Sequence, residues 1–107
     1  MDTHLYIKSP ADGLSLNTLA ICEQKDPKAA ILFIHGLCGK IGRMLPTMKH
    51  FAAEGYACIA FDMRGHGDSI KTEEDRGYTY HGGSRAMAED IRAVIGWIES
   101  HFPKTPI

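Results

Sequence analysis

Residues 29–36 read Ala-Ala-Ile-Leu-Phe-Ile-His-Gly, and residues 56–69 read Tyr-Ala-Cys-Ile-Ala-Phe-Asp-Met-Arg-Gly-His-Gly-Asp-Ser. Each stretch begins with an apolar run that does not alternate with polar residues, and each ends in a glycine-bearing turn. Such runs are typical of strands buried on both faces, as in a parallel sheet covered by helices. We therefore expect two buried parallel strands, at 29–34 and 56–62. Ligands of such sheets bind at the carboxyl ends of the strands, where both turns fall.

The composition is that of an ordinary globular protein. The chain has 107 residues, of which 44% are hydrophobic and 23% charged, and its formal net charge is -1. This length predicts one domain, residues 1–107, with a single core. Lys and Arg are dispersed, which argues against nucleic-acid binding. No apolar run approaches the roughly 18 residues that a transmembrane segment needs, and the first residues do not resemble a secretory signal.

The three cysteines, Cys22, Cys38 and Cys58, are odd in number and widely spaced. This spacing does not favour a disulfide or a zinc site. We expect reduced thiols in a cytoplasmic protein, with Cys22 and Cys58 acting as small core residues.

The segments around the two buried strands predict the remaining elements. Residues 3–8 and 14–23 are expected to pair as an antiparallel hairpin around a turn at 9–13. Apolar residues at helical spacing follow the first buried strand. We expect this helix to begin at Pro46, because proline suits a first turn and damages a helix interior, and to end at Gly55.

A second amphipathic helix is predicted after residues 81–84. Its apolar residues recur at three- and four-residue steps, and they are Met87, Ile91, Val94, Ile95 and Ile98. The charged residues of the same segment are expected to face solvent, and they are Glu89, Asp90, Arg92 and Glu99. The polar stretch 69–80 is expected to be a surface excursion. The order hairpin, strand, helix, strand, helix indicates an α/β fold with right-handed parallel crossovers.

In this order, these segments resemble the amino-terminal part of an α/β-hydrolase. More narrowly, they resemble the branch of monoacylglycerol lipases, lysophospholipases and serine aminopeptidase-like (S33-type) esterases. The resemblance rests on residues 30–36, on residues 61–69 and on the end of the second helix at 98–103 before Pro106 and Ile107. It implies a three-layer α/β-hydrolase fold, a small lipid or other carboxylic ester as substrate, and neither a cofactor nor a metal.

The resemblance also implies roles for the two glycine turns. The main-chain N–H of Leu37 is expected to be one donor of the oxyanion hole, with His35 and Gly36 shaping the loop. Preorganised N–H groups stabilise the negative charge that develops on a reacting carbonyl. The second turn is expected to brace the active-site region without supplying the nucleophile, and its residues are Arg64, Gly65, His66, Gly67, Asp68 and Ser69.

Three other chemical interpretations of these turns are less favoured. His66, Asp68 and Ser69 are near neighbours in one turn, so the histidine cannot easily lie between nucleophile and carboxylate as in a triad. The pair His66 and Asp68 lacks the partner spacing of a metal site. Cys38 with His35 has the same geometric difficulty as a nucleophile pair, and Cys38 lies on the expected oxyanion loop.

The 107 residues contain no Gly-X-Ser-X-Gly sequence. In the resembling family this motif carries the nucleophile on a turn after the fifth strand, and the acid and the histidine follow it. The stretch Gly82-Gly83-Ser84 lacks both a preceding buried strand and the second glycine. We therefore expect a truncated domain that ends before the nucleophile and is inactive alone. An aspartate nucleophile, as in dehalogenases and epoxide hydrolases, stays open.

The strand order of the resembling fold, 1-2-4-3-5, implies that the strand at 31–34 is an unpaired apolar edge. Such an edge invites pairing with another chain. We expect self-association through it. It also supports a second hypothesis of a different class, a non-enzymatic module that binds or complements a partner through the open edge.

Overall fold

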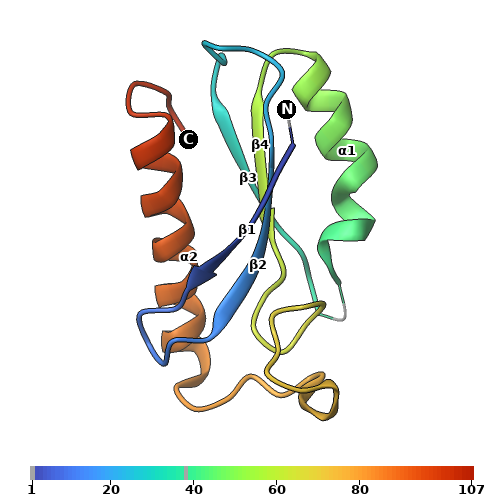
Figure 1. Ribbon diagram of the computed structural model, residues 1–107, viewed down its shortest axis with the longest axis vertical. Coiled ribbons are helices and arrows are strands. Elements are labelled where there is room, and N and C mark those ends of the chain that lie inside the picture. The colour runs from blue at the N-terminus through green and yellow to red at the C-terminus, as the bar shows by residue number, and fades with distance from the viewer. Residues whose placement is uncertain (1, 38) are drawn as a thin grey trace.

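The computed structural model describes residues 2–37 and 39–107, so the predictions for Cys38 lie outside the described residues. In chain order the elements are β1 (Asp2–Lys8), β2 (Ser15–Ile21), β3 (Ala30–Ile34), α1 (Ile41–Ala53), β4 (Ala57–Phe61), the short 3₁₀ helix η1 (Glu73–Asp75) and α2 (Gly83–His101). The strands form one sheet in the order β1-β2-β4-β3, with α1 over one face and α2 over the other (Figure 1). The predicted α/β class and its three layers are confirmed.

The sheet is mixed, and its parallel part is the predicted one. β1 pairs antiparallel with β2 as the expected hairpin, and β2 pairs antiparallel with β4. β3 runs parallel to β4, with Ala30 opposite Ala57 and Ile34 opposite Phe61. The carboxyl ends of β3 and β4 therefore lie together, at the bottom of Figure 1, where both glycine turns begin.

β4 is buried along its whole length, as predicted. Its residues alternate between the two faces of the sheet. Ile59 and Phe61 belong to the apolar cluster under α2, which includes Val94 and Ile98. Cys58 and Ala60 belong to the cluster under α1, which includes Met48. The absence of polar alternation in β4 thus reflects a strand with a helix on each side.

β3 is less buried than predicted, because it is an edge strand. Ala30 is buried, the next three residues are half-buried, and Ile34 is 45% exposed. β4 lies on one side of β3. On the other side, the N–H of Ala30 donates to the carbonyl of Pro106 at 2.8 Å. Successive peptide groups of a strand point in opposite directions, so the N–H groups of Leu32 and Ile34 face the same open side as that of Ala30.

α1 begins at Ile41, earlier than the predicted start at Pro46, so that prediction is wrong. Pro46 removes one helical hydrogen bond, whose acceptor would be the carbonyl of Gly42. Gly42 is exposed, so water can replace the missing N–H. The N–H of Ile41 donates to a carboxylate oxygen of Asp62 at 2.8 Å, which fixes the start of the helix before the proline. Gly55 follows the helix with φ +99°, as its predicted role requires.

α2 has the predicted apolar face, but one residue of its predicted polar face is buried. Val94 and Ile98 are buried, whereas Arg92 and Glu99 are exposed as expected. Asp90 is 1% exposed and faces the protein interior, so its assignment to solvent is wrong. Within residues 2–37 and 39–107, no helix has the length and apolar character needed to cross a membrane.

Candidate active site

A tight turn follows β3, and no hydrogen-bond acceptor is recorded among the described residues for the N–H of Leu37 in this turn. The N–H of Gly39 donates to the carbonyl of Gly36 at 3.0 Å and closes the turn. Among the residues that the structure describes, no acceptor is recorded for the N–H of Leu37, and Leu37 is 89% exposed. The expected role of this N–H as an oxyanion-hole donor stays a prediction.

His35 holds this turn in place. Its Nε2 accepts a hydrogen bond from the N–H of Met63 at 2.9 Å, and its Nδ1 lies 2.7 Å from the carbonyl oxygen of Gly36. A main-chain N–H only donates and a carbonyl only accepts, so the ring is the neutral tautomer with its proton on Nδ1. Both ring nitrogens are thus engaged. His35 positions the loop and keeps no nitrogen for proton transfer.

The glycine that the turn itself requires is Gly39. A Cβ at this position would lie 2.7 Å from the Cβ of His35 and 2.9 Å from the carbonyl oxygen of Gly36. A Cβ on Gly36 would meet nothing within 4 Å. Sequence reasoning emphasised Gly36 and did not assign a role to Gly39. The shaping role of Gly36 therefore stays a prediction.

Arg64 is fully buried and joins segments that are distant in sequence. Its guanidinium donates to both carboxylate oxygens of Asp90 on α2, the shorter bond being 2.7 Å, and to both carboxylate oxygens of Asp12, the shorter being 2.9 Å. It also donates to the hydroxyl of Ser9 and to the carbonyl of Thr79. All of its donors are therefore used within the protein, and none is left for a substrate.

The two carboxylates determine the charge state of this cluster. Hydrogen bonds to Asp90 and Asp12 raise the pKa of Arg64. The Arg64 guanidinium lowers the pKa of Asp12 below its usual value of 3.8, although partial burial opposes this. The cluster is consequently an ionised network that ties the hairpin turn and α2 to the loop after β4. The sequence signal that could have found Asp90 is a single carboxylate placed among the apolar positions of α2.

Asp62, like Arg64, joins segments that are distant in sequence. One of its carboxylate oxygens accepts from the N–H of Ile41, and the other accepts from the side-chain amide of Asn17 and from the N–H of Asp68. Asp62 is 3% exposed. It therefore fixes the start of α1, the middle of β2 and the 64–69 loop relative to one another. Neither Asp62 nor Asn17 was assigned a role from the sequence.

Other residues of the 64–69 loop make hydrogen bonds that fix the conformation of the loop. Ser69 is fully buried; its hydroxyl donates to the carbonyl of Asp62 at 2.5 Å and accepts from the N–H of Asn17. His66 donates from Nδ1 to the carbonyl of Arg64, and its ring packs against that of His35 with centroids 5.1 Å apart. Ser69 is thus inaccessible to a substrate. Within the described residues, no three His, Cys, Asp or Glu side chains gather into a metal-binding group.

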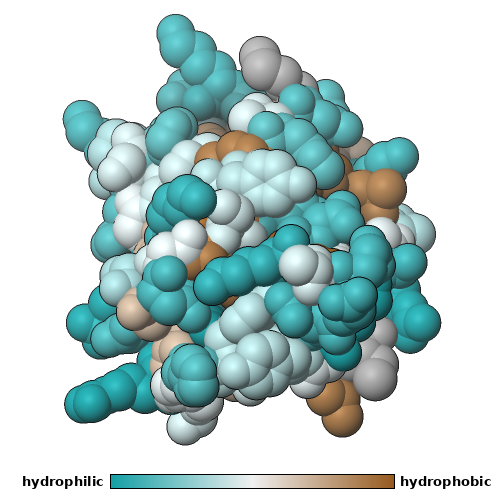
Figure 2. All heavy atoms as spheres, turned by 60° about the horizontal axis from the view of Figure 1, so that its bottom comes forward, coloured by the Kyte–Doolittle hydropathy of each residue, from teal (hydrophilic) through white to brown (hydrophobic). Residues whose placement is uncertain are grey.

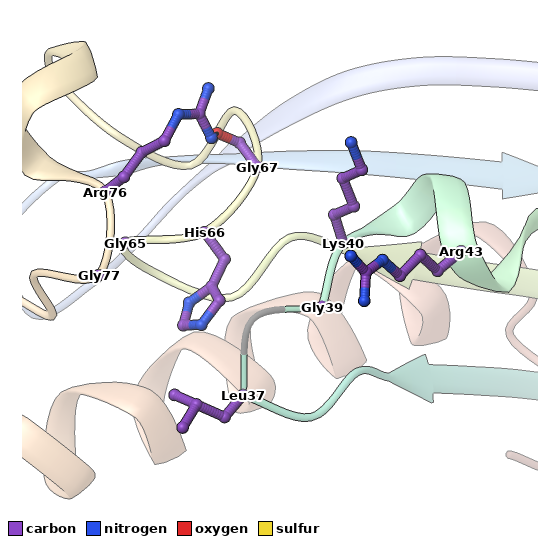
Figure 3. A pocket seen from close by; sticks show the side chains of 9 residues that line it. All are labelled: Leu37, Gly39, Lys40, Arg43, Gly65, His66, Gly67, Arg76 and Gly77. Carbon is purple, nitrogen blue, oxygen red and sulfur yellow. Dashed lines mark hydrogen bonds between the residues drawn. The ribbon is translucent and has the colours of Figure 1, made fainter.

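The two glycine turns face each other across a hollow of about 360 Å³, here called the Leu37 hollow (Figure 3). Among the described residues, five with side chains line it, and they are Leu37, Lys40, Arg43, His66 and Arg76. Four glycines complete the lining, and they are Gly39, Gly65, Gly67 and Gly77. Figure 2 shows this end of the molecule as mostly hydrophilic, with apolar residues in small separate patches.

Comparison with known proteins identifies the family. Residues 25–107 match the sequence profile of the family described as "Serine aminopeptidase, S33". The chain belongs to the S33 serine aminopeptidase family of α/β-hydrolases. It is 33% identical over 81 residues to lysophosphatidylserine lipase ABHD12 of Mus musculus, covering 74% of this chain and 18% of that protein. It is 32% identical over 74 residues to protein ABHD8 of Homo sapiens, covering 69% of this chain and 16% of that protein.

Solved structures of an esterase and a lipase share the fold. A carboxyl esterase from Bacillus coagulans superposes with a TM-score of 0.83 at 23% identity, over 98% of this chain and 34% of that one. A monoglyceride lipase from Saccharomyces cerevisiae superposes with a TM-score of 0.77 at 21% identity, over 94% of this chain and 31% of that one. The chain therefore spans less than a fifth of these curated relatives and about a third of these solved structures.

Proposed function

We propose that this chain supplies the oxyanion loop of an ester hydrolase whose nucleophile lies on a segment outside these 107 residues. The observation that carries the proposal is the N–H of Leu37. Leu37 is an exposed residue just after the carboxyl end of β3 and lines the Leu37 hollow, and no acceptor for its N–H is recorded among the described residues. The family supports the hydrolase class, and the absence of Gly-X-Ser-X-Gly from the 107 residues supports a nucleophile on another segment.

The chemistry follows from the geometry of that donor. When a nucleophile attacks an ester carbonyl held in the Leu37 hollow, negative charge develops on the carbonyl oxygen. The N–H of Leu37 donates to this oxygen, and its position is fixed before the reaction by His35 and by the Gly36–Gly39 bond. One such donor contributes about 3 kcal/mol to the barrier reduction. The 64–69 loop acts by holding the other wall of the hollow in place.

The proposed substrate is a lipid-like carboxylic ester. The names of the similar proteins, a lysophosphatidylserine lipase and a monoglyceride lipase, support this class. The proposed compartment is the cytoplasm, and this is supported by Cys58, which forms no disulfide. No cofactor or metal enters the proposed reaction.

The first test is to translate the DNA that follows the codon of Ile107 in every reading frame. We expect one of these frames to encode a Gly-X-Ser-X-Gly sequence shortly downstream. The 107-residue chain alone should hydrolyse a short-chain nitrophenyl ester no faster than buffer does, and the protein extended through this motif should turn it over. Unrelated downstream sequence, or turnover by the pure 107-residue chain, would contradict the proposal.

In the extended protein, Leu37→Pro is expected to lower kcat by about 10²–10³-fold, because proline removes the N–H that stabilises the oxyanion. The matched control is Leu37→Ala, which keeps the N–H and removes a side chain that is already 89% exposed. Steady-state kinetics with the nitrophenyl ester measure both variants, and thermal melting checks that both are folded. Equal kcat values for the two variants would show that this N–H is not a catalytic donor.

A second candidate function is partner binding through the edge of β3. The specific observation is its composition: Ala-Ile-Leu-Phe-Ile carries no charge, whereas the other edge strand, β1, carries Asp2, His4 and Lys8. Charged residues protect a sheet edge from pairing, and an apolar edge with open N–H groups invites it. On this proposal β3 pairs with a second copy of the chain or with a complementing segment.

We expect the 107-residue chain to self-associate, with a weight-average mass that rises with concentration in sedimentation equilibrium. Ile34→Lys should reduce this association, because it places a charge on the apolar edge. Tyr6→Lys, on the opposite edge at β1, is the control and should leave the association unchanged. A monomer at every concentration would rule out pairing with a second copy.

A further inference from the structure

The Leu37 hollow carries an excess of positive charge. Three of its lining residues are cations, Lys40, Arg43 and Arg76, and no Asp or Glu is among the described residues that line it. Cationic side chains around a hollow attract a ligand that carries anionic oxygen atoms.

The three cations differ in the hydrogen bonds and ion pairs that they make with other residues of the protein. Arg76 pairs with Glu73 at 2.9 Å and donates to the carbonyl of Gly67 at 2.7 Å. For Lys40 and Arg43, by contrast, no side-chain hydrogen bond or ion pair with another described residue is recorded, and both are exposed. These two side chains are therefore free to bind a ligand.

Two carboxylates lie near these cations. Asp62 and Asp68 line an adjoining hollow together with Lys40. Asp62 is buried and accepts three hydrogen bonds from N–H groups, whereas Asp68 is exposed. Both carboxylates interact electrostatically with Arg76, but no ion pair joins either of them to Lys40 or Arg43. Lys40 and Arg43 are therefore the two cations of the Leu37 hollow for which no ion pair with a described residue is recorded.

Figure 3 shows where these side chains stand relative to the proposed donor. The guanidinium of Arg43 turns back toward Gly39 and Lys40, and the side chain of Lys40 extends away from Leu37. Arg76, which follows η1, extends toward Gly67 across the hollow. Leu37 and His66 lie on the remaining side of the same hollow. A ligand that reaches the N–H of Leu37 therefore has Lys40 and Arg43 within the same hollow.

We propose that Lys40 and Arg43 form a subsite for an anionic oxygen group, a phosphate or a carboxylate, that the ester substrate carries close to its scissile bond. The substrate is then a charged lipid-like ester, and a neutral one is disfavoured. This proposal rests on the proposed function for the identity of the ester, but not for the binding of the anion. The planar fork of Arg43 suits two oxygens of one anion, and Lys40 adds a point charge.

The first test measures anion binding by the 107-residue chain, without any catalysis. Inorganic phosphate, acetate and uncharged glycerol are each titrated into ¹⁵N-labelled protein in a non-phosphate buffer, and NMR records the Arg43 Nε–H and the main-chain amides of residues 39–43. We expect saturable shifts with phosphate or acetate, none with glycerol, and weaker binding as salt is raised. Whichever anion binds more tightly identifies the group.

The matched variants separate a built subsite from general attraction to positive charge. Lys40→Gln/Arg43→Gln should weaken anion binding about tenfold, as expected for two partly exposed charge contacts. Arg85→Gln/Arg92→Gln removes two arginines from another hollow, where Glu89 is also present, and should not weaken it. Equal binding by all three proteins, or no saturable binding by the unmodified chain, would overturn the subsite.

The second test uses the extended enzyme and two matched esters, a glycerol monoester and its glycerophosphate counterpart. The ratio of kcat/KM for the phosphate ester to that for the neutral ester should fall about tenfold in Lys40→Gln/Arg43→Gln and stay constant in Arg85→Gln/Arg92→Gln. An unchanged ratio in the first variant overturns the subsite and leaves the hydrolase proposal standing. Turnover of neither ester by the unmodified enzyme contradicts the proposed function, and the NMR titration then still decides the subsite.

Discussion

Arg64→Met is expected to lower the free energy of unfolding by about 3–5 kcal/mol, the cost of removing one partner of a buried ion pair. Without the guanidinium, Asp12 can be hydrated, because its side chain is 26% exposed. The side chain of Asp90 is 2% exposed and would remain as a buried charge without a cation. Urea denaturation at neutral pH, followed by circular dichroism, measures the loss.

Two further variants isolate the cause. Arg92→Met removes an exposed arginine from the same helix that carries Asp90, and it should change the free energy of unfolding by no more than about 0.5 kcal/mol. Asp90→Asn in the Arg64→Met background should restore part of the loss, because it removes the uncompensated charge. If Arg64→Met costs less than 1 kcal/mol in this assay, the cluster does not hold the fold together in the way described.

Gly65→Ala is expected to destabilise the protein by about 2–5 kcal/mol, from two causes that add. Gly65 has φ +79°, a left-handed conformation that costs a residue with a Cβ about 1–2 kcal/mol. A Cβ there would also overlap the carbonyl oxygen of Tyr78, which is main chain and cannot rotate away. Forcing atoms into a filled space costs about 1–3 kcal/mol more. Thermal and urea unfolding measure the total.

Gly77→Ala is the matched control for this substitution. Gly77 has φ +86°, close to that of Gly65, but a Cβ at Gly77 would meet nothing within 4 Å. Gly77 also donates its N–H to the carbonyl of Gly65 at 2.7 Å, so the two positions belong to one contact. We expect Gly77→Ala to show the conformational cost alone. Equal losses at the two positions would mean that the close approach to Tyr78 contributes nothing.

The elements of the fold were predictable wherever hydrophobic pattern decides the outcome. The runs at 29–34 and 56–62 indicated β3 and β4 and their parallel pairing. The apolar spacing of Val94 and Ile98 indicated the buried face of α2. The start of α1 was mispredicted because local propensity around Pro46 competes with a distant carboxylate. The bond from Ile41 to Asp62 joins residues that lie close together only in the folded chain.

The candidate site was predictable in position but not in its supporting contacts. The two glycine turns were expected at one end of the sheet, and they do lie there across the Leu37 hollow. The networks around Arg64 and Asp62 could not be predicted, because their members are spread over the chain and each looks like an ordinary surface residue. Asp90 shows this most clearly, since a charged residue on a helix is usually exposed and this one is buried by its partner.

The segment 36–40 is held at both ends by consecutive residues that follow β4. His35, just before it, is bound to the N–H of Met63, and Ile41, just after it, is bound to the carboxylate of Asp62. We therefore expect that adding or deleting one residue between these two anchors would displace Leu37 from its place just after the carboxyl end of β3. The stretch 70–75 lies outside these anchors and has most of its residues exposed. We therefore expect insertions and deletions to be tolerated better in the stretch 70–75 than in the segment 36–40.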